Sequence, residues 1–184
     1  MDAVKKAAPP RRAWARIRLF AMDVDGVLTD GTVSVSSDGT ETKRFSIIDG
    51  LGLLLVRRQG VDLAWISGRQ SEATSLRAAE LKIPHLIQGR HDKLEALASL
   101  AAGLGIALGD CAYMGDDFID APAIAAAGIG ISVPTGLPEA IAAADYVTRR
   151  PAGSGAVREV CDLLMASRAT GPRNPKARRR TKAW

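Results

Sequence analysis

Short apolar runs alternate with longer segments in which apolar residues recur every three or four positions. The short runs end in polar residues or glycine and are typical of buried strands, whereas the longer segments have helical periodicity. We predict strands at residues 17–23, 61–67, 85–89, 111–115, 128–133 and 145–148. We predict helices at residues 50–59, 71–82, 92–104, 117–127, 137–144 and 155–167. This alternation indicates a doubly wound α/β fold with a mainly parallel sheet.

One segment breaks the alternation directly after the first strand. Residues 32–46 contain two stretches of period-two alternation joined by a Ser-Asp-Gly turn, which is typical of a β-hairpin. Only 41 residues separate Asp25 from Ser67, and 25 separate Ser67 from Lys93, so the chain has no room for a cap domain. The hairpin is too small to exclude water from a site by itself. A neighbouring subunit is the natural candidate for that task.

Basic residues are concentrated at the two ends of the chain. The net charge is +5, but residues 1–18 carry six basic side chains and one acidic one, and residues 168–184 carry seven basic ones. Residues 19–167 contain 12 Lys or Arg and 19 Asp or Glu, so the folded part is acidic. A nucleic-acid-binding domain carries its basic surface on the folded body. We therefore expect nucleic acid to bind at most non-specifically, through the tails.

The composition divides the chain into three regions. We predict a basic disordered tail at residues 1–16, a single domain at residues 17–167 and a second basic disordered tail at residues 168–184. No apolar run approaches the roughly 18 residues of a membrane span, and the first residues lack the apolar stretch of a secretory signal. These features predict a cytoplasmic protein without membrane association.

Carboxylates are the main candidates for chemistry, because the Cys and His residues are isolated from one another at spacings that do not suit a metal. Asp23 and Asp25 end the first predicted strand and can project to the same side of an extended backbone. This pair suits phosphoryl transfer, with Asp23 as nucleophile and Asp25 as the acid that protonates the leaving oxygen and later the base for water. Acidic pairs at strand ends also serve as helix caps or solvated turns.

Two further strand ends offer ligands for phosphate. Ser67 and Gly68 present a hydroxyl and nearby backbone N–H groups. Asp92 and Glu95 form a capping-box pattern that places Lys93 in the first turn of a helix. The helix dipole disfavours a cation there, so we expect a nearby anion such as bound phosphate. A solvated Lys93 that pairs with Glu95 or Asp92 is the structural alternative.

Three acids follow the fourth predicted strand. Asp116, Asp117 and Asp120 lie close enough to repel one another, and a divalent cation between them would remove the repulsion. Hard oxygen ligands favour Mg²⁺. Asp23, the backbone carbonyl of Asp25 and Asp116 would form the protein share of the metal shell. Asp117 and Asp120 are expected to support those ligands without contacting the ion.

These four sites, in this order, resemble the four motifs of the haloacid dehalogenase-like phosphatases. The segments DVDGVLTDG, SIIDGLG, SGR, QGRHDK, YMGDD and GAVREVCDLL are also similar to those of the 3-deoxy-D-manno-octulosonate 8-phosphate phosphatases, and the similarity covers about residues 17–166. The resemblance implies a capless, Mg²⁺-dependent phosphatase that acts through a phospho-aspartate on Asp23. Its substrate would be a phosphorylated sugar acid of lipopolysaccharide precursor synthesis.

The resemblance also implies roles for individual residues. Asp23 and Asp25 would be catalytic, Asp23 and Asp116 would be metal ligands, and Ser67 and Lys93 would bind phosphate. Substrate contacts would fall on Asp25, Ser46, Ile47, Ile48, Asp49, Gly50, Arg69, Arg77 and Lys93. The family further implies a homotetramer in which Arg158 contributes to a neighbouring site.

The chain departs from this family at Leu54, which bears on recognition of the substrate's carboxylate, at Ala152 and Ser154, which bear on the C-terminal tail, and in residues 132–140. Leu54 stands where such phosphatases often carry Lys or Arg, and Ala152 and Ser154 stand where relatives tend to have Gly and Arg. An alternative substrate is an acylneuraminate or another nonulosonate 9-phosphate. A different class of function is a non-catalytic regulatory domain that binds RNA through its basic ends.

Overall fold

A computed structural model describes residues 8–169. Its centre is a six-stranded parallel sheet with the strand order β5-β4-β1-β6-β7-β8. The strands are β1 (Leu19–Met22), β4 (Asp62–Ile66), β5 (His85–Ile87), β6 (Cys111–Met114), β7 (Ile129–Ser132) and β8 (Tyr146–Val147). Every predicted strand is present, and the doubly wound, mainly parallel fold is confirmed.

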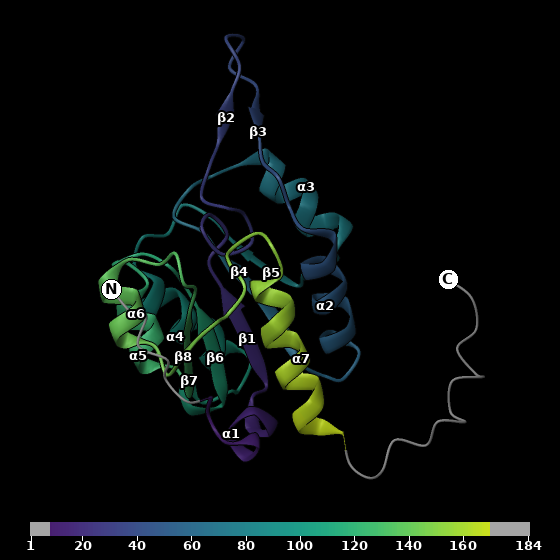
Figure 1. Ribbon diagram of the computed structural model, residues 1–184, viewed down its shortest axis with the longest axis vertical. Helices are drawn as coiled ribbons and strands as arrows, with labels where there is room; N and C mark the ends of the chain where they lie inside the picture. Colours follow the sequence, from purple (N-terminus) through teal and green to yellow (C-terminus); the bar gives the residue numbers. More distant parts are fainter. Residues whose placement is uncertain (1–7, 170–184) are drawn as a thin grey trace, which may run out of the picture.

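Helices cover both faces of the sheet (Figure 1). One face carries α1 (Arg11–Arg16), α2 (Ile47–Arg57), α3 (Glu72–Glu80) and α7 (Ala156–Arg168). The other face carries α4 (Lys93–Gly103), α5 (Ala121–Ala126) and α6 (Pro138–Ala143), and a 3₁₀ turn, η1 (Leu108–Asp110), precedes β6. No helix within residues 8–169 has the length and apolar character needed to cross a bilayer.

Strand β1 separates the two halves of the core. Its side chains alternate between the faces, as a strand requires: Phe20 and Met22 pack with α2 and α7, whereas Leu19 and Ala21 pack with α4 and α5. All four residues are fully buried. A central strand with both faces covered is apolar throughout, so it appears in the sequence as a continuous apolar run.

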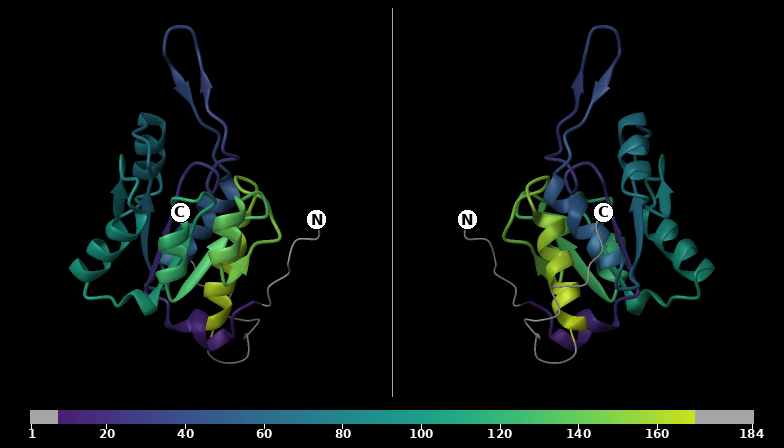
Figure 2. Two further views of the ribbon diagram at one scale, coloured as in Figure 1. Left: turned by 90° about the vertical axis from the view of Figure 1, so that its left-hand side faces the viewer. Right: turned by 90° about the vertical axis from the view of Figure 1, so that its right-hand side faces the viewer.

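The hairpin is confirmed and lies beyond the carboxyl end of β1. Strands β2 (Ser34–Val35) and β3 (Glu41–Thr42) pair antiparallel. The hairpin projects away from the sheet and its helices in all three views (Figures 1 and 2). Only its base contacts the domain closely, so the tip leaves the carboxyl edge of the sheet uncovered within one chain.

The predicted domain boundaries were wrong at residues 11–16 and at Arg168. Residues 11–16 form α1, in which Trp14 is 2% exposed and packs edge-to-face on Tyr146 with ring centroids 5.9 Å apart. Arg168 ends α7 and donates hydrogen bonds to the carbonyl oxygens of Trp14 and Ile17. The boundary after residue 16 was predicted from the basic residues of this segment, but burial of the Trp14 side chain stabilises the segment as part of the domain. The remaining tail residues, 1–7 and 170–184, lie outside the described residues.

Candidate active site

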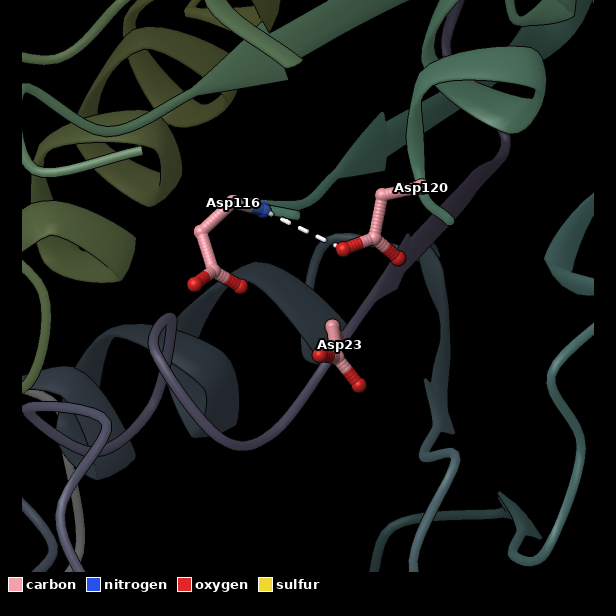
Figure 3. Close-up of side chains that lie close together, drawn as sticks. All are labelled: Asp23, Asp116 and Asp120. Atoms are coloured by element: carbon pink, nitrogen blue, oxygen red, sulfur yellow. Dashed lines mark hydrogen bonds between the residues drawn. The ribbon is translucent and has the colours of Figure 1, made fainter. Parts of the chain in front are cut away.

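Three carboxylates meet at the carboxyl ends of β1 and β6. Asp23 directly follows β1, and its N–H donates to the carbonyl oxygen of Met114 at 2.9 Å, which joins the ends of the two strands. Asp116 and Asp120 belong to the segment after β6. Asp23, Asp116 and Asp120 each offer a carboxylate oxygen, and these oxygens lie within 4.8 Å of one another (Figure 3).

Asp120 is held by donors from its own loop. One of its oxygens accepts a hydrogen bond from the Tyr113 hydroxyl at 2.8 Å. The other accepts from the backbone N–H groups of Asp117 at 3.1 Å and of Asp116 at 3.2 Å, the second of which is drawn in Figure 3. These bonds also explain why α5 begins at Ala121, later than predicted: the Asp120 side chain folds the preceding residues into a turn.

Asp116 has an oxygen without a hydrogen-bond donor, whereas both oxygens of Asp120 accept hydrogen bonds. Its Oδ1 atom is buried and has no hydrogen-bond partner among the described residues. A buried carboxylate oxygen without a donor is costly unless a cation lies beside it. The donor set therefore fits a hard divalent cation, with Asp23 and Asp116 as available ligands and Asp120 as the residue that orients their loop.

The electrostatics of the cluster lead to the same conclusion. Burial raises the pKa of Asp23 to about 7, and the charge of Asp120 adds to this effect, while Lys93 opposes it. Burial likewise raises the pKa of Asp116 to about 7, with further contributions from Asp23, Asp120 and Asp117. Like charges this close favour protonation, and a divalent cation would restore the ionised forms.

Lys93 joins the cluster from α4. Its side chain is fully buried, and its Nζ donates to Asp23 Oδ1 at 2.6 Å and to the carbonyl oxygen of Ile66 at 2.6 Å, while lying 3.6 Å from Asp120 Oδ1. One ammonium group thereby links the ends of β1 and β4. The anion beside Lys93 in this structure is the Asp23 carboxylate, and the phosphate that the sequence predicts there stays a prediction.

The helix start that places Lys93 was partly predicted. Asp92 caps α4 by accepting the N–H of Glu95 at 3.0 Å. The Glu95 side chain pairs with Arg90 at 3.2 Å, which replaces the reciprocal bond of a capping box. The alternative of a solvated Lys93 was wrong, because Lys93 is 1% exposed.

Ser67 and Gly68 lie at the end of β4, beside β1. Ser67 is buried, and its Oγ accepts the N–H of Arg69 at 3.1 Å. A Cβ atom on Gly68 would lie 3.1 Å from the Nδ1 atom of His91, so the segment after β5 approaches this turn closely. The parallel pairing of β1 with β4 brings the Ser67 turn to the same sheet edge as the acid cluster.

Gly26 has a steric role that the sequence did not reveal. Its φ is +85°, and a Cβ atom at this position would lie 2.0 Å from Asp116 Oδ2. The Asp116 carboxylate lies against the Gly26 backbone, so the turn after β1 and the acid that follows β6 fit together.

Asp25 has a partner that the sequence analysis missed. Lys43, just after β3, has no exposed side-chain surface, and its Nζ donates to Asp25 Oδ2 at 2.8 Å and lies 2.7 Å from Asp25 Oδ1. The available signal was the hairpin alternation, which places Lys43 on the same face as Glu41. That pattern does not show whether the face is directed toward the domain.

The predicted sugar contacts gather at the start of α2. Ser46 caps the helix by accepting the Asp49 N–H at 3.4 Å, and Ile47 and Ile48 are exposed. The Asp49 carboxylate is buried and accepts the N–H groups of Gly155 at 3.1 Å and Arg158 at 2.7 Å. Its side chain therefore holds α7 against α2.

Two arginines border this region. A Cβ atom on Gly50 would lie 2.6 Å from Arg77 Nη2, so the glycine makes room for the guanidinium, which donates to the Ser46 carbonyl oxygen at 3.4 Å. Arg69 is half exposed and pairs with Glu41 at 2.7 Å. Within the chain, the Arg158 side chain pairs with Asp162 at 2.8 Å.

Known proteins share this fold and these motifs. The family model of haloacid dehalogenase-like hydrolases matches residues 67–160. The 3-deoxy-D-manno-octulosonate 8-phosphate phosphatase of Escherichia coli (strain K12) is 44% identical over 149 residues, which are 81% of this chain and 79% of that protein.

Two crystal structures of phosphatases with the same name also match. The Moraxella catarrhalis enzyme, in complex with magnesium, phosphate and KDO, is 50% identical with a TM-score of 0.84, over 85% of this chain and 90% of that one. The Yersinia pestis enzyme is 41% identical with a TM-score of 0.84, over 86% and 85%. The chain belongs to the haloacid dehalogenase-like hydrolases and, within them, to the 3-deoxy-D-manno-octulosonate 8-phosphate phosphatase family.

Proposed function

We propose that this chain is a Mg²⁺-dependent phosphatase that releases phosphate from 3-deoxy-D-manno-octulosonate 8-phosphate. The observation that carries the proposal is the acid cluster. Asp23 is buried and Asp116 is half-buried, the two lie close together, and both are protonated more readily than ordinary carboxyls, at the sheet edge where Lys93 and Ser67 also lie. Family membership supplies the identity of the sugar acid.

The reaction takes place in two steps. An Asp23 oxygen forms a bond to phosphorus while the ester P–O bond breaks, and Asp25 gives a proton to the departing sugar oxygen. Asp25 then takes a proton from water, whose oxygen attacks the phosphorus and releases phosphate from Asp23. Both carboxylates return to their starting states, so the cycle consumes only ester and water.

The remaining polar groups hold the phosphoryl group and the cation. Asp23, Asp116 and the backbone carbonyl of Asp25 would be the Mg²⁺ ligands, supported by Asp117 and Asp120. When bound, Mg²⁺ offsets repulsion between carboxylate and phosphate and stabilises negative charge in the transition state. The second part of the site consists of groups that would donate to phosphate oxygens, namely Lys93, the Ser67 hydroxyl and the Gly68 N–H.

The sugar acid is proposed to lie against the start of α2. Its contacts would come from Asp25 and Lys93 and from the group Ser46, Ile47, Ile48, Asp49, Gly50, Arg69 and Arg77. Because the Asp49 carboxylate is used by the start of α7, Asp49 is left to contribute through its backbone. Leu54 packs against the core, so the departure from Lys or Arg at this position removes one potential carboxylate partner and increases the importance of Arg69 and Arg77.

A homotetramer is proposed to close the site. Large apolar side chains are exposed on the hairpin and on the helices beside it, including Val35 (68%), Ile47 (81%) and Leu76 (65%). Exposed apolar side chains of this size favour a protein partner. A neighbouring copy would cover them and would bring Arg158 toward an adjacent site. Such an enzyme would act in the cytoplasm on a small phosphorylated sugar acid.

The test is a phosphate-release screen over 8- and 9-phosphorylated sugar acids, with and without Mg²⁺. We expect Mg²⁺-dependent release from 3-deoxy-D-manno-octulosonate 8-phosphate, and none from an Asp23→Asn variant that retains its circular dichroism spectrum. Preference for an acylneuraminate 9-phosphate would contradict the proposed substrate. Undiminished turnover by Asp23→Asn would contradict the mechanism.

A further inference from the structure

Lys43 is a buried cation at the base of the hairpin. Its side chain has no exposed surface, although it belongs to a segment whose neighbours Thr42 and Arg44 are exposed. Removing an ammonium group from water costs several kcal/mol unless partners replace the lost hydration. The fold therefore requires specific partners for this group.

The Lys43 ammonium group has two hydrogen-bond partners and a more distant acid. Its Nζ donates to Asp25 at 2.8 Å and to Thr74 Oγ1 at 3.3 Å, and it lies 4.0 Å from Glu41 Oε1, which is close enough for an ion pair only. The Lys43 side chain has no exposed surface, so it is shielded from a substrate that enters from solvent. Lys43 therefore acts on the reaction through Asp25.

The base of the hairpin is attached to the domain on the same face. Glu41 and Lys43 are two residues apart, so their side chains point to one side of the strand. Glu41 accepts a hydrogen bond from Ser71 Oγ, in the cap of α3, and pairs with Arg69 at 2.7 Å. Thr74, inside α3, is fully buried. The position of Lys43 Nζ is thus fixed by the hairpin and by α3 together.

We propose that Lys43 is a positioning residue that holds the Asp25 carboxylate in place for proton transfer. The inference rests on the proposed function, in which Asp25 is the acid and base. Proton transfer requires the carboxyl within hydrogen-bond reach of the leaving oxygen, and the Asp25 side chain is 19% exposed. Without the ion pair, this carboxylate is free to rotate into solvent.

The experiment compares Lys43→Met with wild type on two phosphate esters. One is the alkyl ester 3-deoxy-D-manno-octulosonate 8-phosphate, whose leaving oxygen needs a proton, and the other is p-nitrophenyl phosphate, whose phenolate leaves without one. We expect kcat/KM to fall about 100-fold on the alkyl ester and less than about 10-fold on the aryl ester. The values of kcat are compared as well, because weaker sugar binding alone would raise KM on the sugar ester and leave its kcat unchanged, whereas loss of proton transfer lowers kcat.

A double-mutant cycle and a matched control complete the design. In an Asp25→Asn background, Lys43→Met is expected to cause no further loss on either ester, because the group that it positions is already gone. Arg44→Met makes a similar change at the exposed neighbour and is expected to leave both activities unchanged. Lys43→Gln serves in the same cycle if the Met variant does not fold.

Equal losses on the two esters, or a further loss in the Asp25→Asn background, would overturn the positioning role and leave Lys43 as a structural residue. Unchanged activity of Lys43→Met on the alkyl ester would overturn it as well. If wild type hydrolyses neither ester, the proposed function itself fails. If wild type is active and the variants do not show the expected pattern, only the positioning role of Lys43 fails.

Discussion

Asp23 and Asp116 combine burial with like charge, and both effects favour their protonated forms. Each has an ordinary pKa of 3.8 and a pKa of about 7 in the folded chain without metal. Ionising these groups therefore costs folding free energy as the pH rises from about 4 through about 7. The metal-free protein should therefore have its lowest free energy of unfolding at neutral to basic pH.

This linkage predicts how Mg²⁺ affects stability. We expect the unfolding temperature in EDTA to be lower at about pH 8 than at about pH 5.5, and Mg²⁺ to raise it more at the higher pH, where it binds ionised carboxylates. Thermal unfolding followed by circular dichroism at both pH values measures the effect. An equal Mg²⁺-induced shift at the two pH values would contradict the assignment of the raised pKa values to the metal ligands.

Gly26 gives a second prediction for a single residue. Gly26→Ala would place a Cβ atom against Asp116 Oδ2 and should raise the Mg²⁺ concentration for half-maximal activity by roughly 10- to 100-fold. Gly60→Ala is the matched control, because Gly60 has a similar φ of +80° with no atom within 4 Å of the added Cβ. Similar Mg²⁺ requirements in the two variants would show that Asp116 is not displaced.

The sequence was informative for residues whose chemistry conflicts with their local position. Lys93 at a helix N-terminus required an anion, and the structure places Asp23 beside it at 2.6 Å. Lys43 showed no such conflict, because a lysine in a short polar hairpin is ordinary. Its burial depends on how the hairpin base meets α3, which lies about 30 residues further along the chain.

At the level of elements, the start of α7 is fixed by a residue of α2. Asp49 accepts two N–H groups from the first turn of α7, at Gly155 and Arg158. Gly155 itself has a φ of +104° and offers no side-chain cap. The acid of one helix thereby replaces the missing cap of another, and this bond joins the predicted sugar-binding region to the C-terminal helix.

We expect Asp49→Ala to lower the free energy of unfolding by about 2 kcal/mol, because two buried N–H groups lose their acceptor. Asp162→Ala is the control: it removes an exposed partner of Arg158 and should cost less than about 0.5 kcal/mol. Urea denaturation measures both. A loss no larger than that of the control would exclude this capping role.

Element prediction succeeded where periodicity was strong and failed where tertiary contacts decide. The six strands and the hairpin follow from apolar runs and alternation. The helix α1 did not, because six residues with three arginines carry no apolar stripe, and contacts distant in sequence stabilise them, such as that of Trp14 with Tyr146. The boundary of α5 was missed because the Asp120 side chain accepts the N–H groups of Asp116 and Asp117, which forms a local turn in place of the first helical turn.

At the scale of the whole molecule, the carboxyl edge of the sheet is uncovered in a single chain, and large apolar side chains are exposed beside it. We expect Ile47→Asp to break the proposed tetramer and to lower activity by about tenfold or more, since water would enter the site. Ala102→Asp, at an exposed position on α4, is the control and should leave assembly unchanged. Light scattering after size-exclusion chromatography gives the mass. A wild-type chain that is monomeric and fully active would refute the closure by subunits.

The most direct test of the central claim is mass spectrometry of the enzyme after acid quenching during turnover with Mg²⁺. With p-nitrophenyl phosphate as substrate, whose leaving oxygen needs no proton from Asp25, the account predicts one phosphoryl group on the peptide that contains Asp23, with more of it in an Asp25→Asn variant, whose second step lacks its base. It predicts none in Asp23→Asn. Phosphate release without this adduct in Asp25→Asn, or an adduct on another residue, would contradict Asp23 as the nucleophile.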